Sequence, residues 1–274
     1  MYSRIRHQSI HDYKLRSTIT NDDDGPVSMI VINDQDTAAL KREDLKKSLY
    51  SKCAECDRGF SSIPSDRIAI DSIINELKTL SPEGNPTRKF FPDNNDTSAS
   101  APLDGAWKLI YTTAFDVLIL GVNPFSITQS IYQVINSTGS AINVINVAPR
   151  LQAFLPQQLV GTGSTLRLKV YIDAKRKSDD EISLRFKSTE IKPITLLGNK
   201  LNFLPSLKLL LPQRILGGDA WKSNDNNNNN NSFGQSSGYF RVLYLDSECL
   251  IIQQNQPGGI FVSVRSSEPL ESIL

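Results

Sequence analysis

From residue 105 onward, short segments alternate apolar and polar side chains, and this alternation restricts the fold more than any other feature. In one segment Leu166, Leu168 and Val170 alternate with Arg167 and Lys169. A period of two places the apolar set on one face of a β-strand. Turn-forming residues separate many of these segments, as expected for hairpins. The predicted strands are 105–113, 128–135, 141–147, 164–173, 181–191, 239–245, 249–254 and 259–265.

About eight short antiparallel strands in one run indicate a sandwich or a barrel. The first strand opens with Gly105, Ala106 and Trp107, which favours a small closed barrel. Glycine lets the chain pass beneath such a barrel, and tryptophan fills the closed end with a large apolar ring. We therefore predict an α+β, mainly β fold: a lipocalin-like antiparallel barrel of about eight strands preceded by two amphipathic helices. Such a barrel is filled by side chains or holds one small ligand, and the sequence leaves both open.

Two segments before the strands have helical periodicity instead. The first spans about 36–56, where leucines and then Cys53 and Cys56 recur at near-helical spacing. The second spans about 66–80, with Ser65 as the expected N-cap. We expect the apolar faces of both helices to pack on the barrel.

The remaining composition predicts the boundaries of the chain's parts. Residues 1–35 are expected to be a disordered tail or a targeting remnant, since residues 1–20 are basic and contain Ser and Thr, and residues 21–26 are typical of a turn or flexible link. A helical pair at 36–82 and a linker at 83–102 precede the barrel at 103–268. Within the barrel, 222–237 includes six consecutive asparagines and is predicted to be a disordered loop.

Charge and hydropathy exclude several function classes. Thirty basic and 29 acidic residues give a formal net charge of +1, which provides no general electrostatic footprint for nucleic acid. No apolar run approaches the roughly 18 residues of a membrane-spanning helix, so any membrane contact is expected to be peripheral.

Catalytic and metal-binding patterns are also missing. The two histidines, His7 and His11, lie in the N-terminal tail, which excludes a His-dependent triad in the folded body. Cys53 and Cys56 lack a second ligand pair for zinc, and we expect both on the buried side of a helix, with a redox role as the alternative. The acidic run 179–181 indicates a solvated turn. We therefore predict no enzymatic activity, no cofactor and no metal site.

The alternating strands predict an apolar barrel lumen. Each inward side chain is more often core packing than a ligand contact, but together they suit an isoprenoid or acyl ligand. The candidates are Trp107, Leu109, Tyr111, Leu166, Leu168, Val170, Leu184, Phe186, Leu243 and Ile260.

Two segments between strands, 115–125 and 201–216, are unusually apolar, and the second has basic residues nearby. Exposed apolar patches with basic neighbours favour a lipid surface or a protein partner. The alternative is that these loops fold over the barrel mouth or pack on the helices. The side chains concerned are Phe115, Leu118, Leu120, Phe125, Phe203, Leu204, Leu207 and Leu210.

Over residues 41–266 the chain resembles the plastid lipid-associated protein (fibrillin) family. The resemblance rests on several segments in the family's order, the most recognisable being Leu103-Asp104-Gly105-Ala106-Trp107 and the residues up to 113. The other segments are 46–80 with its Asp57-Arg58-Gly59 turn, 131–135, 142–146, 242–246 and 259–265. One departure is clear: Leu250 and Gln253 stand where relatives have arginines.

The resemblance implies a lipocalin-like barrel in plastids (chloroplasts), associated with thylakoids or plastoglobules. It implies binding of a prenylquinone, a carotenoid or another lipid, with a peripheral membrane or lipid-body surface as the second partner. The alternative is a ligand-free interaction scaffold that docks a partner enzyme of plastid isoprenoid metabolism. Because leucine cannot replace a charged planar donor, any arginine-dependent contact of the relatives is in doubt here.

Overall fold

The structure, a computed structural model, describes residues 34–90, 101–115, 117–118, 124–150, 163–201, 204–209, 238–255 and 258–274. The predicted N-terminal tail, apart from its last two residues, and the whole of the predicted Asn-rich loop, 222–237, lie outside these ranges. The helices are α1 (Asp34–Glu55), α2 (Pro64–Thr79) and α5 (Leu270–Ile273). The strands are β1 (Gly105–Thr112), β2 (Ser126–Asn136), β3 (Ser140–Pro149), β4 (Thr165–Arg176), β5 (Glu181–Leu196), β6 (Asn199–Lys200), β7 (Leu207–Leu209), β8 (Tyr239–Leu245), β9 (Cys249–Gln254) and β10 (Gly259–Arg265).

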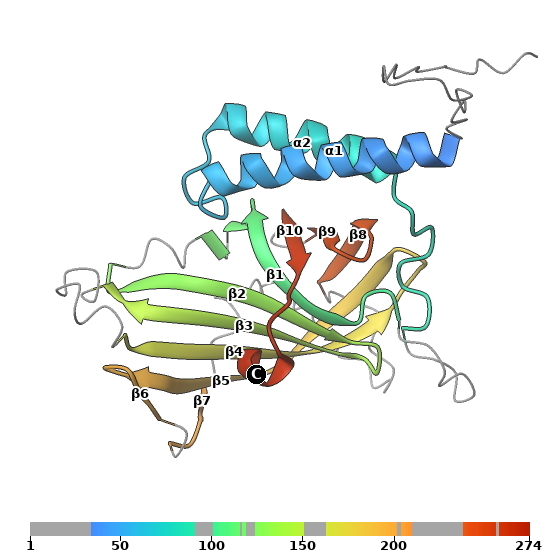
Figure 1. The fold of residues 1–274 in the computed structure, drawn as a ribbon. Helices are drawn as coiled ribbons and strands as arrows, with labels where there is room; N and C mark the ends of the chain where they lie inside the picture. The colour runs from blue at the N-terminus through green and yellow to red at the C-terminus, as the bar shows by residue number, and fades with distance from the viewer. Residues whose placement is uncertain are drawn as a thin grey trace, which may run out of the picture.

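The strands form one antiparallel sheet in the order β4-β3-β2-β1-β10-β9-β8-β5-β6, and an additional pairing joins β4 to β5. Eight strands are therefore hydrogen-bonded in a ring (Figure 1). The pairing of β5 with β8 is short, from Glu181–Arg241 to Ser183–Tyr239. Farther along β5, its free edge pairs with β7 and β6 instead. The wall of the ring is thus continuous around the first residues of β5 and less regular beyond them.

The eight predicted strands and both predicted helices are confirmed, with ends that differ by at most five residues. The last three strands have the predicted bounds. The short strands β6 and β7 and the C-terminal helix α5 were not predicted.

The predicted N-cap at Ser65 is wrong: α2 begins at Pro64, and the carboxylate of Asp66 accepts a hydrogen bond from the backbone nitrogen of Ile63. Proline is well tolerated at a first helical position because its missing N–H has no intrahelical partner there.

The two helices lie side by side across β1, β10, β9 and β8 on the outside of the ring (Figure 1). Their apolar faces meet the outward side chains of these strands in one cluster that buries Leu49, Ile70, Ile74 and Leu77. Cys53 and Cys56 are buried in the same cluster, as predicted. The helix pair is therefore a second layer over one wall of the ring. Of the helices that the described residues form, none combines the length and the apolar character needed to span a bilayer.

Lys46 attaches α1 to the turn between β8 and β9. Its ammonium group is almost fully buried and lies 2.8 Å from Glu43, 3.0 Å from Asp246 and 3.1 Å from Glu248. The hydroxyl of Tyr244 donates to the same Asp246 carboxylate at 2.6 Å. A buried lysine is tolerated here because carboxylates compensate its charge.

The turn between the helices attaches them to the ring. Arg58 donates from its two terminal nitrogens to the backbone oxygens of Gln129 and Thr128, both at 2.8 Å. Gly59 has a φ of +99°, and a Cβ at this position would lie 2.1 Å from the backbone oxygen of Thr112. Glycine is therefore required, and the helical layer is docked tightly onto the ends of β1 and β2.

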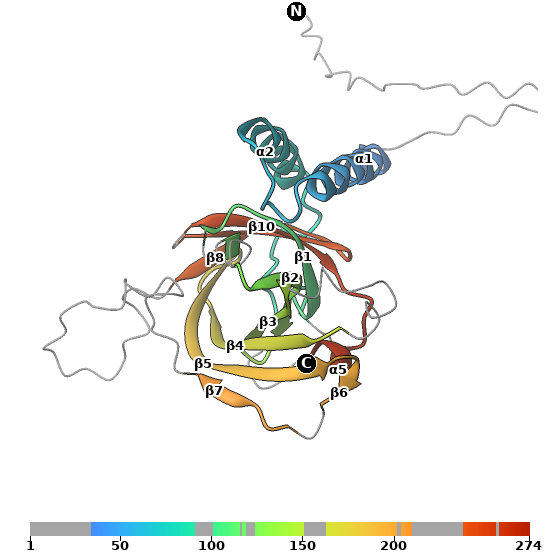
Figure 2. The same cartoon turned by 90° about the vertical axis from the view of Figure 1, so that its left-hand side faces the viewer.

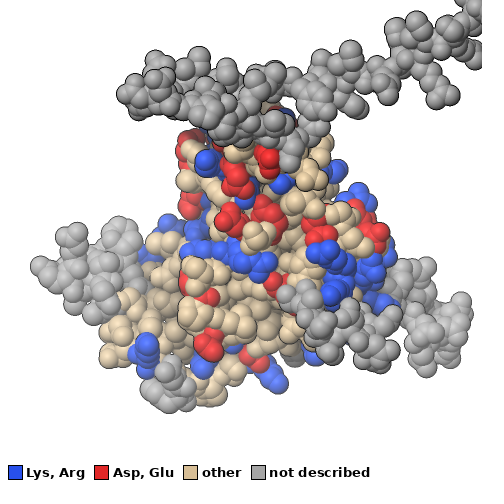
Figure 3. Space-filling view, turned by 45° about the vertical axis from the view of Figure 1, so that its right-hand side comes forward, with Lys and Arg blue, Asp and Glu red and all other residues tan. Residues whose placement is uncertain are grey.

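The surface charge is mixed rather than of one sign. In the view of Figure 3, acidic and basic side chains are interspersed over the helices and one flank, and broad uncharged areas lie below. The face in this view therefore presents no large field of a single sign to a polyanion.

Candidate functional site

One end of the ring, which we call the closed end, is sealed by Phe90, Leu103 and Trp107, all buried. The indole nitrogen of Trp107 donates to the backbone oxygen of Leu103 at 2.9 Å. The guanidinium of Arg265 stacks on the Trp107 ring, with its central carbon 4.2 Å from the ring centroid. The predicted role of Trp107 as the side chain that fills the closed end therefore agrees with its position. Leu250, which replaces an arginine expected from relatives, is buried in the same apolar cluster.

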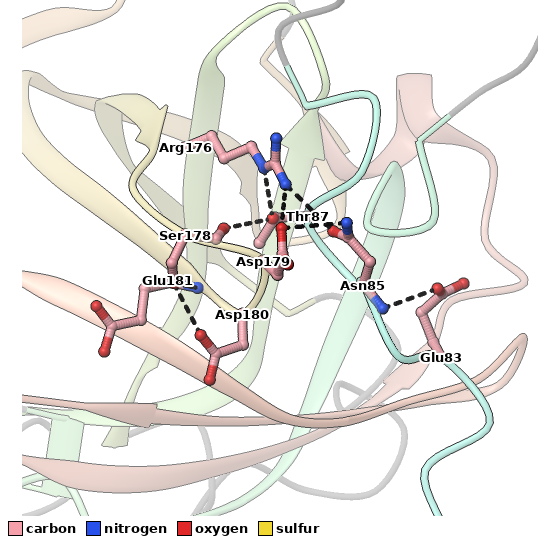
Figure 4. A network of polar contacts seen from close by, with 8 residues as sticks. All are labelled: Glu83, Asn85, Thr87, Arg176, Ser178, Asp179, Asp180 and Glu181. Carbon is pink, nitrogen blue, oxygen red and sulfur yellow. Dashed lines mark hydrogen bonds and ion pairs between the residues drawn. The ribbon is translucent and has the colours of Figure 1, made fainter.

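A strap of residues preceding β1 is fixed across this end by the polar network of Figure 4. Thr87 donates from its hydroxyl to the backbone oxygen of Ser178 at 2.6 Å and accepts from Arg176 at 2.9 Å. Asn85 donates to the carboxylate of Asp179 at 3.2 Å. This network holds Phe90 in the closed end, so part of the predicted linker contacts the β4–β5 hairpin.

Several inward side chains in the rest of the ring are apolar and partly accessible. Leu168 and Leu184, both predicted to face inward, belong to the interior clusters but are only half-buried, as is Phe261. Leu166 lies opposite Val147 and Pro193 and is 37% exposed. Phe186 lies opposite the inward-facing Ile172 and is 44% exposed. Leu166 is thus accessible near the start of β4, away from the closed end, whereas Leu109 and Val170 are buried. Phe186 lies nearer the start of β5, just beyond the three residues that pair with β8.

Two amides interrupt this apolar interior. Gln133 lies opposite the inward-facing Trp107, and Asn143 lies opposite both Gln133 and the inward-facing Val170. Directly paired residues project from the same face of a sheet, so both amides face the interior. The side-chain nitrogen of Gln133 is 3.2 Å from the side-chain oxygen of Asn143. Sequence reasoning missed this pair, although the polar residues at the middle of two otherwise apolar inward faces were visible.

Three predicted lumen residues face the helices instead. Tyr111 and Leu243 are buried in the cluster beneath α1 and α2, and Ile260 packs against the same cluster. The register shifts between Leu109 and Tyr111, and again between Val242 and Tyr244. A β-bulge adds one residue to a strand and so exchanges the faces of the side chains beyond it. Burial beneath the helices raises the pKa of Tyr111 to about 12.

Ile260 has a simpler explanation than a bulge. Its neighbour Phe261 belongs to the interior clusters, and adjacent side chains of a strand point to opposite faces. The prediction therefore had this strand in the wrong phase: Ile260 faces outward and Phe261 inward.

The end opposite the closed end, which we call the rim, is where β1, β3 and β5 end and β2 and β4 begin; Figure 2 views the molecule from this side. Phe115 is 71% exposed and Phe125 is 82% exposed. Leu207 is also exposed, whereas Leu118 and Leu204 are half-buried. The other three predicted loop residues, Leu120, Phe203 and Leu210, lie outside the described residues.

The rim has further apolar and basic residues that were not predicted. Leu196 and Leu197 are exposed at the turn from β5 to β6, and the backbone nitrogen of Leu197 donates to the hydroxyl oxygen of Ser164, just before β4, at 3.1 Å. The exposed Arg150 donates from its backbone nitrogen to the backbone oxygen of Phe125 at 2.8 Å. Lys200, three residues after Leu197, and Lys208, next to the exposed Leu207, are also exposed. The rim thus combines large apolar side chains with cations.

A separate groove of about 440 Å³ lies outside the ring, between α1 and strands β1 and β10. Its apolar lining includes Tyr50, Ile110 and Val264, and Arg58 and Lys108 also line it. Lys108 lies 3.5 Å from Glu268, so its charge is already compensated. Among the described residues, no group of three or more His, Cys, Asp or Glu side chains could hold a metal ion.

Together these features define a class: a mainly β protein whose antiparallel strands form a ring around an apolar interior that is sealed at one end and covered on one wall by a helical pair. The model of the PAP/fibrillin family matches residues 43–264, and the chain belongs to this family of plastid lipid-associated proteins. A curated relative, the probable plastid-lipid-associated protein 5, chloroplastic, of Arabidopsis thaliana, is 29% identical over 98 residues. That match covers 36% of this chain and 37% of the relative.

Proposed function

We propose that this protein binds a hydrophobic small molecule, such as a prenylquinone, a carotenoid or another lipid, inside a lipocalin-like barrel formed by the strand ring. The observation that supports the proposal is the accessibility of interior side chains, above all Phe186 and Leu166. Apolar surface that stays in contact with water is stabilised when an apolar ligand covers it. The family and the chloroplastic relative favour a plastid location, at thylakoids or plastoglobules. Catalysis is not part of this proposal.

Titration of delipidated protein with a fluorescent apolar probe tests ligand binding. Leu168→Trp adds volume to the half-buried interior, and we expect it to weaken binding at least tenfold. Lys187→Trp adds the same ring at a position that is 67% exposed and serves as the matched control. Thermal melting establishes that both variants are folded. Absence of saturable binding by the wild-type protein would overturn the proposal.

We further propose that the rim contacts the lipid surface from which such a ligand is taken. Exposed aromatic and leucine side chains enter the interfacial region of a lipid layer, and nearby cations add attraction to anionic headgroups. Phe115, Phe125, Leu197 and Lys200 are the described rim residues in the strongest position to do so.

Flotation with vesicles tests this contact. Phe125→Ser with Leu197→Ser is expected to reduce the bound fraction severalfold. Ile68→Ser on α2 is the control, because Ile68 is 71% exposed but belongs to the helical layer rather than the rim. An equal loss with the control variant, or no loss with the rim variant, would contradict a rim-directed contact.

The second candidate function is a ligand-free scaffold that docks a partner enzyme. The observation that favours it is the exposure of Leu40, Ile63 and Ile68 on or beside the two helices. A protein that binds no apolar probe, but loses association with a partner on Ile68→Ser, would have this function instead.

A further inference from the structure

We infer that the amide pair Gln133–Asn143 recognises the uncharged polar end of an otherwise apolar ligand, such as a carbonyl or a hydroxyl, and so sets both ligand class and orientation. The inference rests on the proposed binding of a hydrophobic molecule in the ring. It adds which molecules the ring interior prefers and which end of the ligand lies toward the closed end.

The pair has unused hydrogen-bonding capacity. An amide side chain has two N–H donors and one oxygen acceptor. One hydrogen bond joins Gln133 to Asn143, and no other hydrogen bond links either side-chain amide to a described residue. Both residues are half-buried rather than sealed. At least one N–H of each amide is therefore available to a ligand.

The surroundings restrict the polar group to an uncharged one. Toward the rim, the β3–β4 wall places Ile145 opposite Leu168 and Val147 opposite Leu166, all on the same face as Asn143. No described inward position of β2, β3 or β4 between the amides and the rim has an ionisable side chain. Arg265, which stacks on Trp107 at the closed end, already donates to the backbone oxygens of Ser247 and Asp104. A charged headgroup at the amides would therefore gain no free counter-ion from these strands, and an unpaired charge is costly in an apolar site. A neutral carbonyl or hydroxyl needs only the hydrogen bonds that the amides offer.

The position of the pair determines the orientation. Gln133 is directly opposite Trp107 at the closed end, so the amides lie at the bottom of the interior rather than at its mouth. Val147 lies four positions beyond Asn143 on β3, about 13 Å along the strand. A ligand whose polar end reaches the amides therefore directs its hydrocarbon chain along this apolar wall toward the rim.

Matched probes test the inference: decyl-benzoquinone, 1-decanol and decylbenzene, which share a ten-carbon chain and differ in the polar end. We expect the wild-type protein to bind the two oxygenated probes roughly 5- to 10-fold more tightly than decylbenzene, as one or two neutral hydrogen bonds would give. Gln133→Leu with Asn143→Leu is expected to remove this preference while decylbenzene binding is retained. Replacing both partners by apolar groups of similar shape is often nearly neutral for stability, so this variant should fold. Gln253→Leu, an exposed amide on β9, is the control.

Orientation has its own readout. In a Trp221→Phe background Trp107 is the single tryptophan, since the sequence contains two. Decyl-benzoquinone, an electron acceptor, should quench Trp107 emission strongly when its ring lies at the amides, and decanol at the same occupancy should not. Failure of all three probes to bind would overturn the proposed function. Equal affinities for the three probes, or a preference that survives in the double variant, would overturn this inference alone.

Discussion

The guanidinium of Arg265 stacks on the indole ring of Trp107 at 4.2 Å while donating to the backbone oxygens of Ser247 at 2.7 Å and Asp104 at 2.8 Å. One side chain from the last strand thus covers the tryptophan of the first strand and ties both to the segment that enters the ring. The closed end is therefore held by a cation–π contact and hydrogen bonds as well as by apolar packing.

We expect Arg265→Leu to lower the free energy of unfolding by about 2–3 kcal/mol, because it removes a cation–π contact and two charge-assisted hydrogen bonds. Urea unfolding at neutral pH measures the change. Arg265→Lys keeps the charge but not the planar fork, and should recover less than half of the loss. Full stability of the lysine variant would show that charge alone matters.

Gly59→Ala is expected to destabilise the protein by about 2–4 kcal/mol, since the position combines a positive φ with a contact that leaves no room for a Cβ. Gly84→Ala is the matched control, because nothing lies within 4 Å of a Cβ there. Differential scanning calorimetry compares the two variants. Similar melting temperatures for both would contradict tight docking of the helix turn on β1.

Lys46→Met should cost about 3 kcal/mol of stability at neutral pH, because it leaves the largely buried carboxylate of Asp246 without its cation. Lys41→Met removes a half-exposed pair with Glu76 and should cost less than about 1 kcal/mol. Denaturant unfolding of both variants provides the comparison. A smaller loss for Lys46→Met than for Lys41→Met would mean that this buried network does not hold α1 on the sheet.

The same network predicts loss of stability in acid. Burial acts to raise the pKa of Asp246, but hydrogen bonds from Tyr244, Lys46 and the backbone outweigh it, and the pKa is lower than usual. A carboxylate with a depressed folded pKa stabilises the fold above its unfolded pKa, and this contribution disappears as the pH falls through the folded pKa. Between pH about 5 and about 2, unfolding free energy should therefore fall more steeply for the wild type than for Asp246→Asn. Urea unfolding at several pH values measures this dependence. If the unfolding free energy of both proteins fell equally with pH, the ionised Asp246 carboxylate would not stabilise the fold.

The three cysteines should be unreactive in the native protein. Burial raises the pKa of Cys53 and of Cys249 to about 12, and it also raises the pKa of Cys56. Because the thiolate is the reactive form, we expect alkylation by iodoacetamide at pH 8 to be roughly a thousandfold slower than in denaturant. Mass spectrometry counts the modified thiols. Rapid labelling of Cys53 and Cys56 in the folded protein would contradict this expectation and favour a redox role for the two thiols.

The sequence alone determined the elements of this protein and their kind. Alternation with a period of two is a local property of each strand, so all eight ring strands could be predicted, as could the helical pair and the burial of Cys53 and Cys56. The closed-end role of Trp107 followed from its place at the start of the first strand.

The acidic run 179–181 was predicted to be solvated, but Glu181 is buried, where it pairs with Arg241 and Lys177. Arg241 is 60 residues from Glu181 in the sequence, so no local pattern predicts this pair.

Only the tertiary structure decided which face each side chain occupies. Tyr111 and Leu243 lie beneath the helices because bulges, which depend on how two strands pair, reverse the alternation within β1 and β8. The facing amides of Gln133 and Asn143 likewise become a pair only through the register of β2 against β3. Periodicity is a property of one segment, whereas register and bulges are properties of two, and this is why the single chain predicted the ring but placed Tyr111 and Leu243 on the wrong face.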